Sequence, residues 1–333
     1  MKQKVLAILL SFSLLFALCV SLVGCGEPER WEEDGRIRVL STVFPSYDFA
    51  RAIGGEAVDA RMLVRPGSNT HSYEPTANDV ILIRECDVFI YVGGENDAWV
   101  HDLLSAMDTE GMVILSLYDI AETLHEEEHK DGMESDHVHT DECEDEHGHK
   151  HDHEAAYDEH VWTSFENAGA ILKAIRDALI RQAPELYSTF DENANAYLNA
   201  LTDIESEYRE AVALAQANTL LFGDRFPFLY LTKELGLDYL AAFSGCSSVT
   251  EPTVSNLIYL IEQAEKAQIP IILYVETSEH SHKTADLIAA EVGAETRMLH
   301  SGHTVSREDY ETGITYLDLL RQNLTVIREA LNP

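Results

Sequence analysis

The chain has 333 residues, of which 45% are hydrophobic and 25% are charged. This is the composition of a globular protein with two ordinary domains or one large one, and it excludes a disordered chain or a coiled coil. With 59 acidic against 23 basic residues, the formal net charge is −36 at pH 7. Such a charge repels nucleic acid and anionic membrane surfaces and fits a cationic partner. Five cysteines are too few for a disulfide framework, so we expect Cys86 and Cys246 to be small buried hydrophobes.

The first segment, residues 1–24, has the pattern of a lipoprotein signal peptide. Lys2 and Lys4 precede an apolar run over residues 5–23, which closes on Gly24 and Cys25 as a lipobox does. A transmembrane anchor is the alternative, because a run of this length can span a bilayer. The acidic stretch that follows favours the lipobox. We therefore expect lipidation of Cys25 and an extracytoplasmic protein held at the cell membrane by several acyl chains.

After a tether over residues 25–36, the chain alternates strands with helices. The N-terminal part, residues 37–184, has strand patterns at 37–43, 57–64, 86–92 and 113–115, and helical patterns at 45–53, 76–85, 98–107 and 162–182. This alternation is typical of a parallel sheet that is covered by helices on both faces.

A longer helical stretch, residues 185–217, separates this part from a second one. Its 30-odd residues would run about 45 Å, which suits a rigid connector between two lobes. In residues 218–333 the strand patterns lie at 219–222, 239–242, 270–275 and 295–299, and the helical patterns at 227–235, 253–267, 283–292 and 309–331. The predicted fold class is α/β, with two Rossmann-like lobes that contain parallel sheets and are joined by one long rigid helix.

Residues 122–158 interrupt the N-terminal lobe with an acidic, histidine-rich run. Almost nothing in it suits a core, so we expect a solvated and largely disordered loop. Alternate imidazoles can chelate metal ions, which makes the loop a candidate for accessory metal capture or sensing that weakens as pH falls. The run holds eight of the fifteen histidines: His125, His129, His137, His139, His147, His149, His151 and His153.

Three further histidines stand where secondary structure is predicted to begin or end. His71 follows a strand and Pro66–Gly67, His160 precedes a helix, and His300 follows a strand. In open α/β sheets ligands bind beyond the carboxyl ends of the strands. Neutral imidazole is the commonest metal ligand, and three imidazoles with an optional carboxylate suit tetrahedral Zn²⁺. The pattern therefore predicts a zinc site between the lobes.

Catalytic signatures are weak in the sequence. It has no Gly-x-Ser-x-Gly elbow, no Walker A sequence and no dinucleotide-binding glycine fingerprint. The segment from His125 to His129 fits His-Glu-x-x-His, but it falls in the insert, for which no helix is predicted. We therefore expect a binding protein rather than an enzyme.

The residues resemble the metal-binding lipoproteins of bacterial zinc and manganese ABC importers, in the cluster with a rigid helix between two α/β lobes. The resemblance extends from Val39 to Leu331, and its histidine-rich insert is similar to the zinc-importing branch. It rests on Ser41–Pro45 with Ile53–Gly55, Pro66–Gly67 before His71–Pro75, Cys86–Gly93 with Glu95 and Trp99, His160–Trp162, and Tyr316–Leu324.

This resemblance implies His71 and His160 as ligands from the N-terminal lobe, and His300 stands where many relatives have an aspartate. The remaining family ligand aligns with Arg225, which cannot bind a cation. Asp224 is the nearest candidate for it, with Glu276 or water as alternatives. The predicted metal ligands are therefore His71, His160, His300 and Asp224. If Asp224 binds and His300 does not, His300 joins the accessory histidines, which include His280, His282 and His303.

The expected function is capture of Zn²⁺, as a transported ligand, between the two lobes and its delivery to an ABC permease with its ATPase. We expect a monomer that contacts the membrane through its lipid anchor and does not bind nucleic acid. A manganese-binding homologue is one alternative, although three histidines argue against Mn²⁺. A metal-binding surface adhesin of the same fold is another, and a zinc hydrolase is a more distant one.

Overall fold

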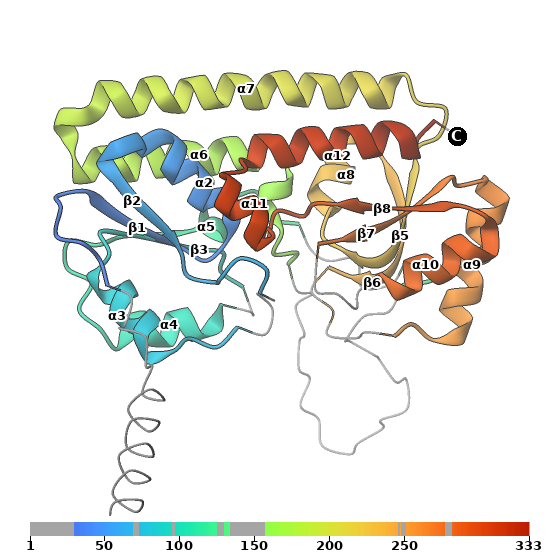
Figure 1. Ribbon diagram of the computed structural model, residues 1–333, viewed down its shortest axis with the longest axis horizontal. Coiled ribbons are helices and arrows are strands. Elements are labelled where there is room, and N and C mark those ends of the chain that lie inside the picture. Colours follow the sequence, from blue (N-terminus) through green and yellow to red (C-terminus); the bar gives the residue numbers. More distant parts are fainter. Residues whose placement is uncertain are drawn as a thin grey trace, which may run out of the picture. The chain divides into compact units, whose positions relative to one another are not determined.

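The computed structural model describes residues 30–68, 73–94, 97–124, 130–133, 157–245, 247, 251–276 and 282–332 (Figure 1). The predicted signal segment with Cys25, the ligand His71 and the eight histidines of the insert lie outside the described residues. Glu33–Pro333 form one compact unit, to which both sheets belong. Within the described part of the chain, no helix combines the length and the apolar composition that crossing a membrane requires.

The N-terminal lobe is built on a four-stranded parallel sheet in the order β2-β1-β3-β4. Its strands are β1 (Ile37–Ser41), β2 (Val58–Met62), β3 (Val88–Tyr91) and β4 (Val113–Ser116). Its helices are α2 (Phe44–Gly54), α3 (Ala77–Glu85), α4 (Ala98–Ser105), α5 (Leu117–Ile120) and α6 (Phe165–Gln182), and a short 3₁₀ turn, η2 (Val161–Thr163), precedes α6.

The C-terminal lobe repeats this arrangement, with a parallel sheet in the order β6-β5-β7-β8. Its strands are β5 (Thr219–Phe226), β6 (Asp238–Ser244), β7 (Ile271–Val275) and β8 (Glu295–Leu299). Its helices are α8 (Leu229–Leu235), α9 (Val254–Ala267), α10 (Lys283–Val292), α11 (Arg307–Thr312) and α12 (Tyr316–Ala330). The fold class predicted from the sequence is therefore confirmed.

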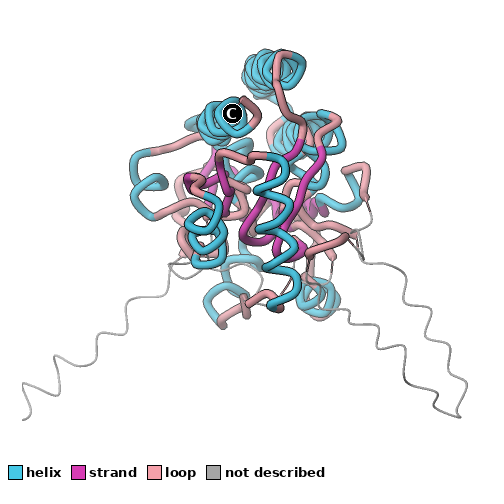
Figure 2. The backbone as a smooth tube through the Cα atoms, turned by 90° about the vertical axis from the view of Figure 1, so that its right-hand side faces the viewer, coloured by secondary structure: helices cyan, strands magenta, loops and turns pink. Residues whose placement is uncertain are grey.

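Both faces of the inner strands β5 and β7 are buried, which explains the apolar runs in their sequences. Along β5, Leu220 and Phe222 belong to the larger hydrophobic core, whereas Leu221 between them belongs to a second core with residues of α9 and α10. Successive side chains of a strand point to opposite faces, so one apolar strand supplies both cores. Figure 2 shows helices on both sides of the strands.

The helix α7 (Tyr187–Ala213) links the two lobes, as predicted, and it is shorter than the predicted stretch. Its 27 residues span about 40 Å at 1.5 Å per residue. Its buried positions recur every three or four residues, which is the pattern of a helix with one buried face. That face packs on α2 and α6 of the N-terminal lobe and on α12 of the C-terminal lobe (Figure 1).

A buried carboxylate ties these three parts together. Asp48 of α2 is fully buried and accepts hydrogen bonds from Arg51 Nη2 (2.6 Å), Tyr197 OH on α7 (2.7 Å) and Tyr316 N on α12 (2.9 Å). Arg51 Nη2 also donates to the backbone oxygen of Ile314 (2.9 Å). One side chain therefore fixes both lobes against the linking helix.

The C-terminal helical pattern, predicted as one helix over residues 309–331, is divided in the structure. Gly313 has a φ of 77°, a left-handed conformation that ends α11. Thr315 then begins α12 with a capping box, in which its side chain accepts from Asp318 N and the Asp318 carboxylate accepts from Thr315 N. The apolar periodicity continues across Gly313 and Thr315, and for this reason the sequence pattern predicted one continuous helix.

The described parts of the insert are packed against the protein, in contrast to the solvated loop predicted from the sequence. Asp158 N donates to Leu124 O (2.9 Å), so the two ends of the insert run together. Within the insert, Met133 packs against the core and Lys130 Nζ lies 3.2 Å from the ring centre of Tyr239. Met133 is apolar and Lys130 is a cation, although the run around them is acidic. Through these two side chains the insert contacts the C-terminal lobe. The rest of that prediction falls on residues outside those described.

Candidate metal site

His160 stands directly before η2 in the N-terminal lobe, and only 1% of it is exposed. Its backbone N donates to Asp158 Oδ1 (2.8 Å), and its Nδ1 lies 3.1 Å from the same oxygen. A carboxylate that accepts from Nδ1–H sets the tautomer and directs Nε2 as the metal-binding nitrogen. The pair of Asp158 and His160 therefore has the arrangement of a metal ligand with its orienting carboxylate.

Space beside this pair depends on the absence of a side chain at Gly245, which follows β6. A Cβ added there would lie 3.2 Å from Asp158 Oδ2, 3.2 Å from His160 Cε1 and 3.0 Å from Phe226 O. Gly245, Asp158 and Met133 of the insert also line a small pocket. The fixed part of the insert therefore reaches the immediate surroundings of His160.

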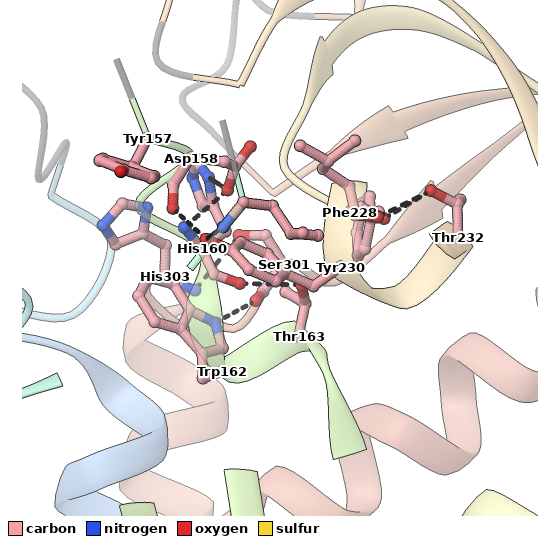
Figure 3. A network of polar contacts seen from close by, with 12 residues as sticks. Tyr157, Asp158, His160, Trp162, Thr163, Phe228, Tyr230, Thr232, Ser301 and His303 are labelled. Atoms are coloured by element: carbon pink, nitrogen blue, oxygen red, sulfur yellow. Dashed lines mark hydrogen bonds and ion pairs between the residues drawn. The ribbon is translucent and has the colours of Figure 1, made fainter. Parts of the chain in front are cut away.

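The C-terminal lobe approaches His160 through the loop that follows β8. His303 of this loop is 8% exposed, and its ring centre lies 5.1 Å from that of His160 and 5.0 Å from that of Trp162. Trp162 Nε1 donates to Ser301 O (2.8 Å), which joins η2 to this loop directly. Figure 3 shows His160, Trp162 and His303 gathered at this junction of the lobes.

Glu276 follows β7 and holds the same loop in place. Its two carboxylate oxygens accept from Ser301 N (2.7 Å) and Ser301 Oγ (2.6 Å). Ser301 Oγ in turn accepts from His303 N (3.2 Å). The alternative metal ligand Glu276 is thus occupied by two hydrogen bonds that shape the loop carrying His303.

The two C-terminal ligands predicted from the sequence have different surroundings. Asp224 is 2% exposed, and its carboxylate accepts from Arg225 N (2.8 Å) and from Val275 N (3.2 Å), so it bridges β5 and β7 where the pairing of β5 shifts register. His300 follows β8, and its Nδ1 is a buried atom with no hydrogen-bond partner among the described residues. Its backbone is fixed by Asn323, which accepts from His300 N and donates to His300 O, both at 2.7 Å.

Arg225, at the position where the resemblance leads us to expect a family ligand, donates from Nε to Ser247 O (2.6 Å). Of the predicted set, His160, His300 and Asp224 are described and His71 is not. Among the described residues, no three or more His, Cys, Asp or Glu side chains form a group that could hold one metal ion. The four-ligand set therefore stays a prediction. Sequence reasoning did not single out Asp158 as an orienting residue, although its spacing of two from His160 was a readable signal.

Comparison with known protein families gives one match that covers most of the chain. The model described as "Zinc-uptake complex component A periplasmic" (ZnuA) matches residues 39–330. This range includes both sheets, the linking helix and the junction at His160.

Individual relatives agree with that match. The zinc-binding lipoprotein AdcA of Streptococcus pneumoniae is 29% identical over 317 residues, which are 95% of this chain and 60% of that protein. The chain thus spans about 60% of the length of this relative. The high-affinity zinc uptake system protein ZnuA of Bacillus subtilis is 27% identical over 318 residues, with 96% of this chain and 94% of that protein covered. The crystal structure of the Zn(II)-bound ZnuA-like domain of S. pneumoniae AdcA superposes with a TM-score of 0.69 at 25% identity, covering 90% of this chain and all of that domain.

Proposed function

The chain belongs to the family of periplasmic zinc-uptake components, and on that premise we propose that it captures Zn²⁺ between its two lobes as the solute-binding component of an ABC importer. One observation carries the proposal. The buried His160, oriented by Asp158, lies where the N-terminal lobe meets the loop after β8 of the C-terminal lobe. A nitrogen ligand held in this way suits Zn²⁺ better than Mn²⁺, which prefers oxygen ligands.

For the ligands, the proposal takes His71 and His160 from the N-terminal lobe and His300 and Asp224 from the C-terminal lobe. The buried, unpartnered Nδ1 of His300 supports a ligand role for that residue. Asp224 accepts two backbone hydrogen bonds, so its contribution has to come from lone pairs that those bonds leave. Histidines 125–153 serve as accessory ligands that raise the local Zn²⁺ concentration, which is supported by the small pocket that Met133 of the insert lines together with Asp158.

The proposal assigns the chain no reaction, because a component of this kind binds its cargo and passes it on unchanged. Its partners are the permease and the ATPase of the importer, and it acts as a monomer. Residues 1–24 are the signal peptide, residues 25–36 are the tether, and Cys25 carries the lipids that hold the protein at the outer side of the cytoplasmic membrane. The lobes are residues 37–184 and 218–333, joined by the helical stretch 185–217.

Titration of the purified protein with Zn²⁺ in competition with a chromophoric chelator tests the proposal. We expect one tight site in the wild-type protein and its loss in His160→Ala. His282→Ala is the matched control, because this histidine of the C-terminal lobe has an exposed side chain whose Nδ1 lies 2.9 Å from Asp286 Oδ2. A His160→Ala protein that retains the fold by circular dichroism and binds Zn²⁺ like the wild type would refute the site.

A further inference from the structure

The contact that His303 makes with the N-terminal lobe could not be inferred from the sequence around it. His303 comes from the loop after β8 in the C-terminal lobe, yet its imidazole packs against His160 and Trp162 of the N-terminal lobe. The two imidazole planes are perpendicular, and their centres are 5.1 Å apart. Within the described residues, His303 is thus a C-terminal imidazole in direct ring contact with the proposed ligand His160 (Figure 3).

The distance between the two rings is the one that a shared zinc ion requires. Zn–N bonds are about 2.0–2.1 Å long and tetrahedral sites have angles near 109°, so two imidazoles on one ion have ring centres roughly 5 Å apart. The observed 5.1 Å meets this requirement without movement of either lobe. Perpendicular planes also let two imidazoles approach one ion without a clash between the rings.

The loop that carries His303 is buried, and several contacts fix its conformation. Gly302 has a φ of 73°, a left-handed conformation that turns the chain directly before His303. Ser301 on its other side is held by both carboxylate oxygens of Glu276 and by Trp162 Nε1. The position of His303 is therefore set by contacts to β7 and to η2, as a preorganised ligand requires.

The charges around the pair also favour a cation. Asp158 and Glu159, which are 2% and 5% exposed, precede His160 directly, and Glu276 supports the loop on the other side. Taking a divalent cation out of water is costly unless buried anions compensate for the lost hydration.

From these observations we propose that His303 is a ligand of the Zn²⁺ that His160 binds, and that it is the imidazole through which the C-terminal lobe closes the site. This inference rests on the proposed function, and in it His303 replaces Asp224, whose carboxylate already accepts two backbone hydrogen bonds, as the fourth ligand of the tetrahedral site. His303 joins His300 as a second imidazole ligand from the C-terminal lobe, in which Arg225 cannot serve as a ligand.

The decisive variant is His303→Phe, which keeps an aromatic ring against Trp162 and removes both nitrogens. We expect Zn²⁺ affinity to fall at least about 100-fold, because the loss even of an outer partner of a metal ligand costs 10–100-fold. His303→Ala should bind as weakly as His303→Phe. If packing alone mattered, His303→Phe would bind Zn²⁺ like the wild type and only His303→Ala would be impaired, and that result would overturn the proposal.

A second measurement detects the ligand in the wild-type protein itself. In wild-type protein with ¹⁵N-labelled histidine, addition of equimolar Zn²⁺ should shift one ring nitrogen of His303, assigned from the spectrum of His303→Phe, together with one of His160. If the His160 signal shifts and that of His303 does not, His303 is not a ligand and the proposed function stands. If neither signal shifts and no tight site exists in the wild type, the proposed function itself fails.

Discussion

Replacement of Asp48 by asparagine should weaken the joint between the two lobes and the linking helix. The carboxylate accepts from Arg51 through Oδ1 and from Tyr197 OH and Tyr316 N through Oδ2. An amide has only one acceptor oxygen, so its NH₂ group faces either the guanidinium or the other two donors. Removal of one partner of a fully buried ion pair costs about 3–5 kcal/mol. Because the Arg51 side chain is 34% exposed, solvent screens the pair, and we expect Asp48→Asn to lower the free energy of unfolding by about 3 kcal/mol, the lower end of that range.

Urea unfolding followed by circular dichroism measures this loss, provided that the dependence of the free energy on urea is unchanged. Tyr197→Phe is the graded control, because it removes one hydrogen bond to a charged group and should cost about 1.5–3 kcal/mol. Burial, followed by the adjacent Asp48 carboxylate, raises the pKa of Tyr197, so its hydroxyl remains a donor throughout the accessible pH range. Asp177→Asn, at an exposed ion pair with Arg176, should change stability by less than about 0.5 kcal/mol. If Asp48→Asn costs less than Tyr197→Phe, the assignment of Asp48 as the joint is wrong.

Two further predictions concern pH and the insert. Burial raises the pKa of Asp97 from 3.8 to about 6, against the opposing hydrogen bonds from Val92 N and Gly93 N. Between these two pH values the folded protein binds more protons than the unfolded chain, so stability falls as pH rises through this window. At neutral pH the ionised Asp97 lowers the free energy of unfolding by roughly 3 kcal/mol. Asp97→Asn should therefore stabilise the protein at about pH 7 and have little effect at about pH 4 in urea unfolding, and an equal effect at both would contradict the assignment. Deletion of residues 134–156, which spares the packed residues 130–133, should leave one tight Zn²⁺ site and remove weaker ones in a titration, whereas loss of the tight site with the fold intact would place a primary ligand in the insert.

The sequence determined the elements and the class of the fold because both follow from local patterns. Apolar runs bounded by Gly and Pro predicted the parallel strands, and a stripe of buried positions every three or four residues predicted α7. His160 became a ligand candidate in the same way, since a histidine at the edge of an element in an α/β fold can face a ligand site whatever the rest of the chain does. Its orienting residue, Asp158, lies only two positions away.

The tertiary structure alone decided what the C-terminal lobe presents to His160. The sequence favoured His300 at the strand end and counted His303 as accessory. The direction of the loop, however, depends on the left-handed conformation of Gly302 and on the hydrogen bonds that Glu276 and Trp162 form with Ser301. Trp162 and Ser301 are 139 positions apart. Periodicity carries no information about such a contact, because it arises only when two separately folded sheets are fixed against one helix.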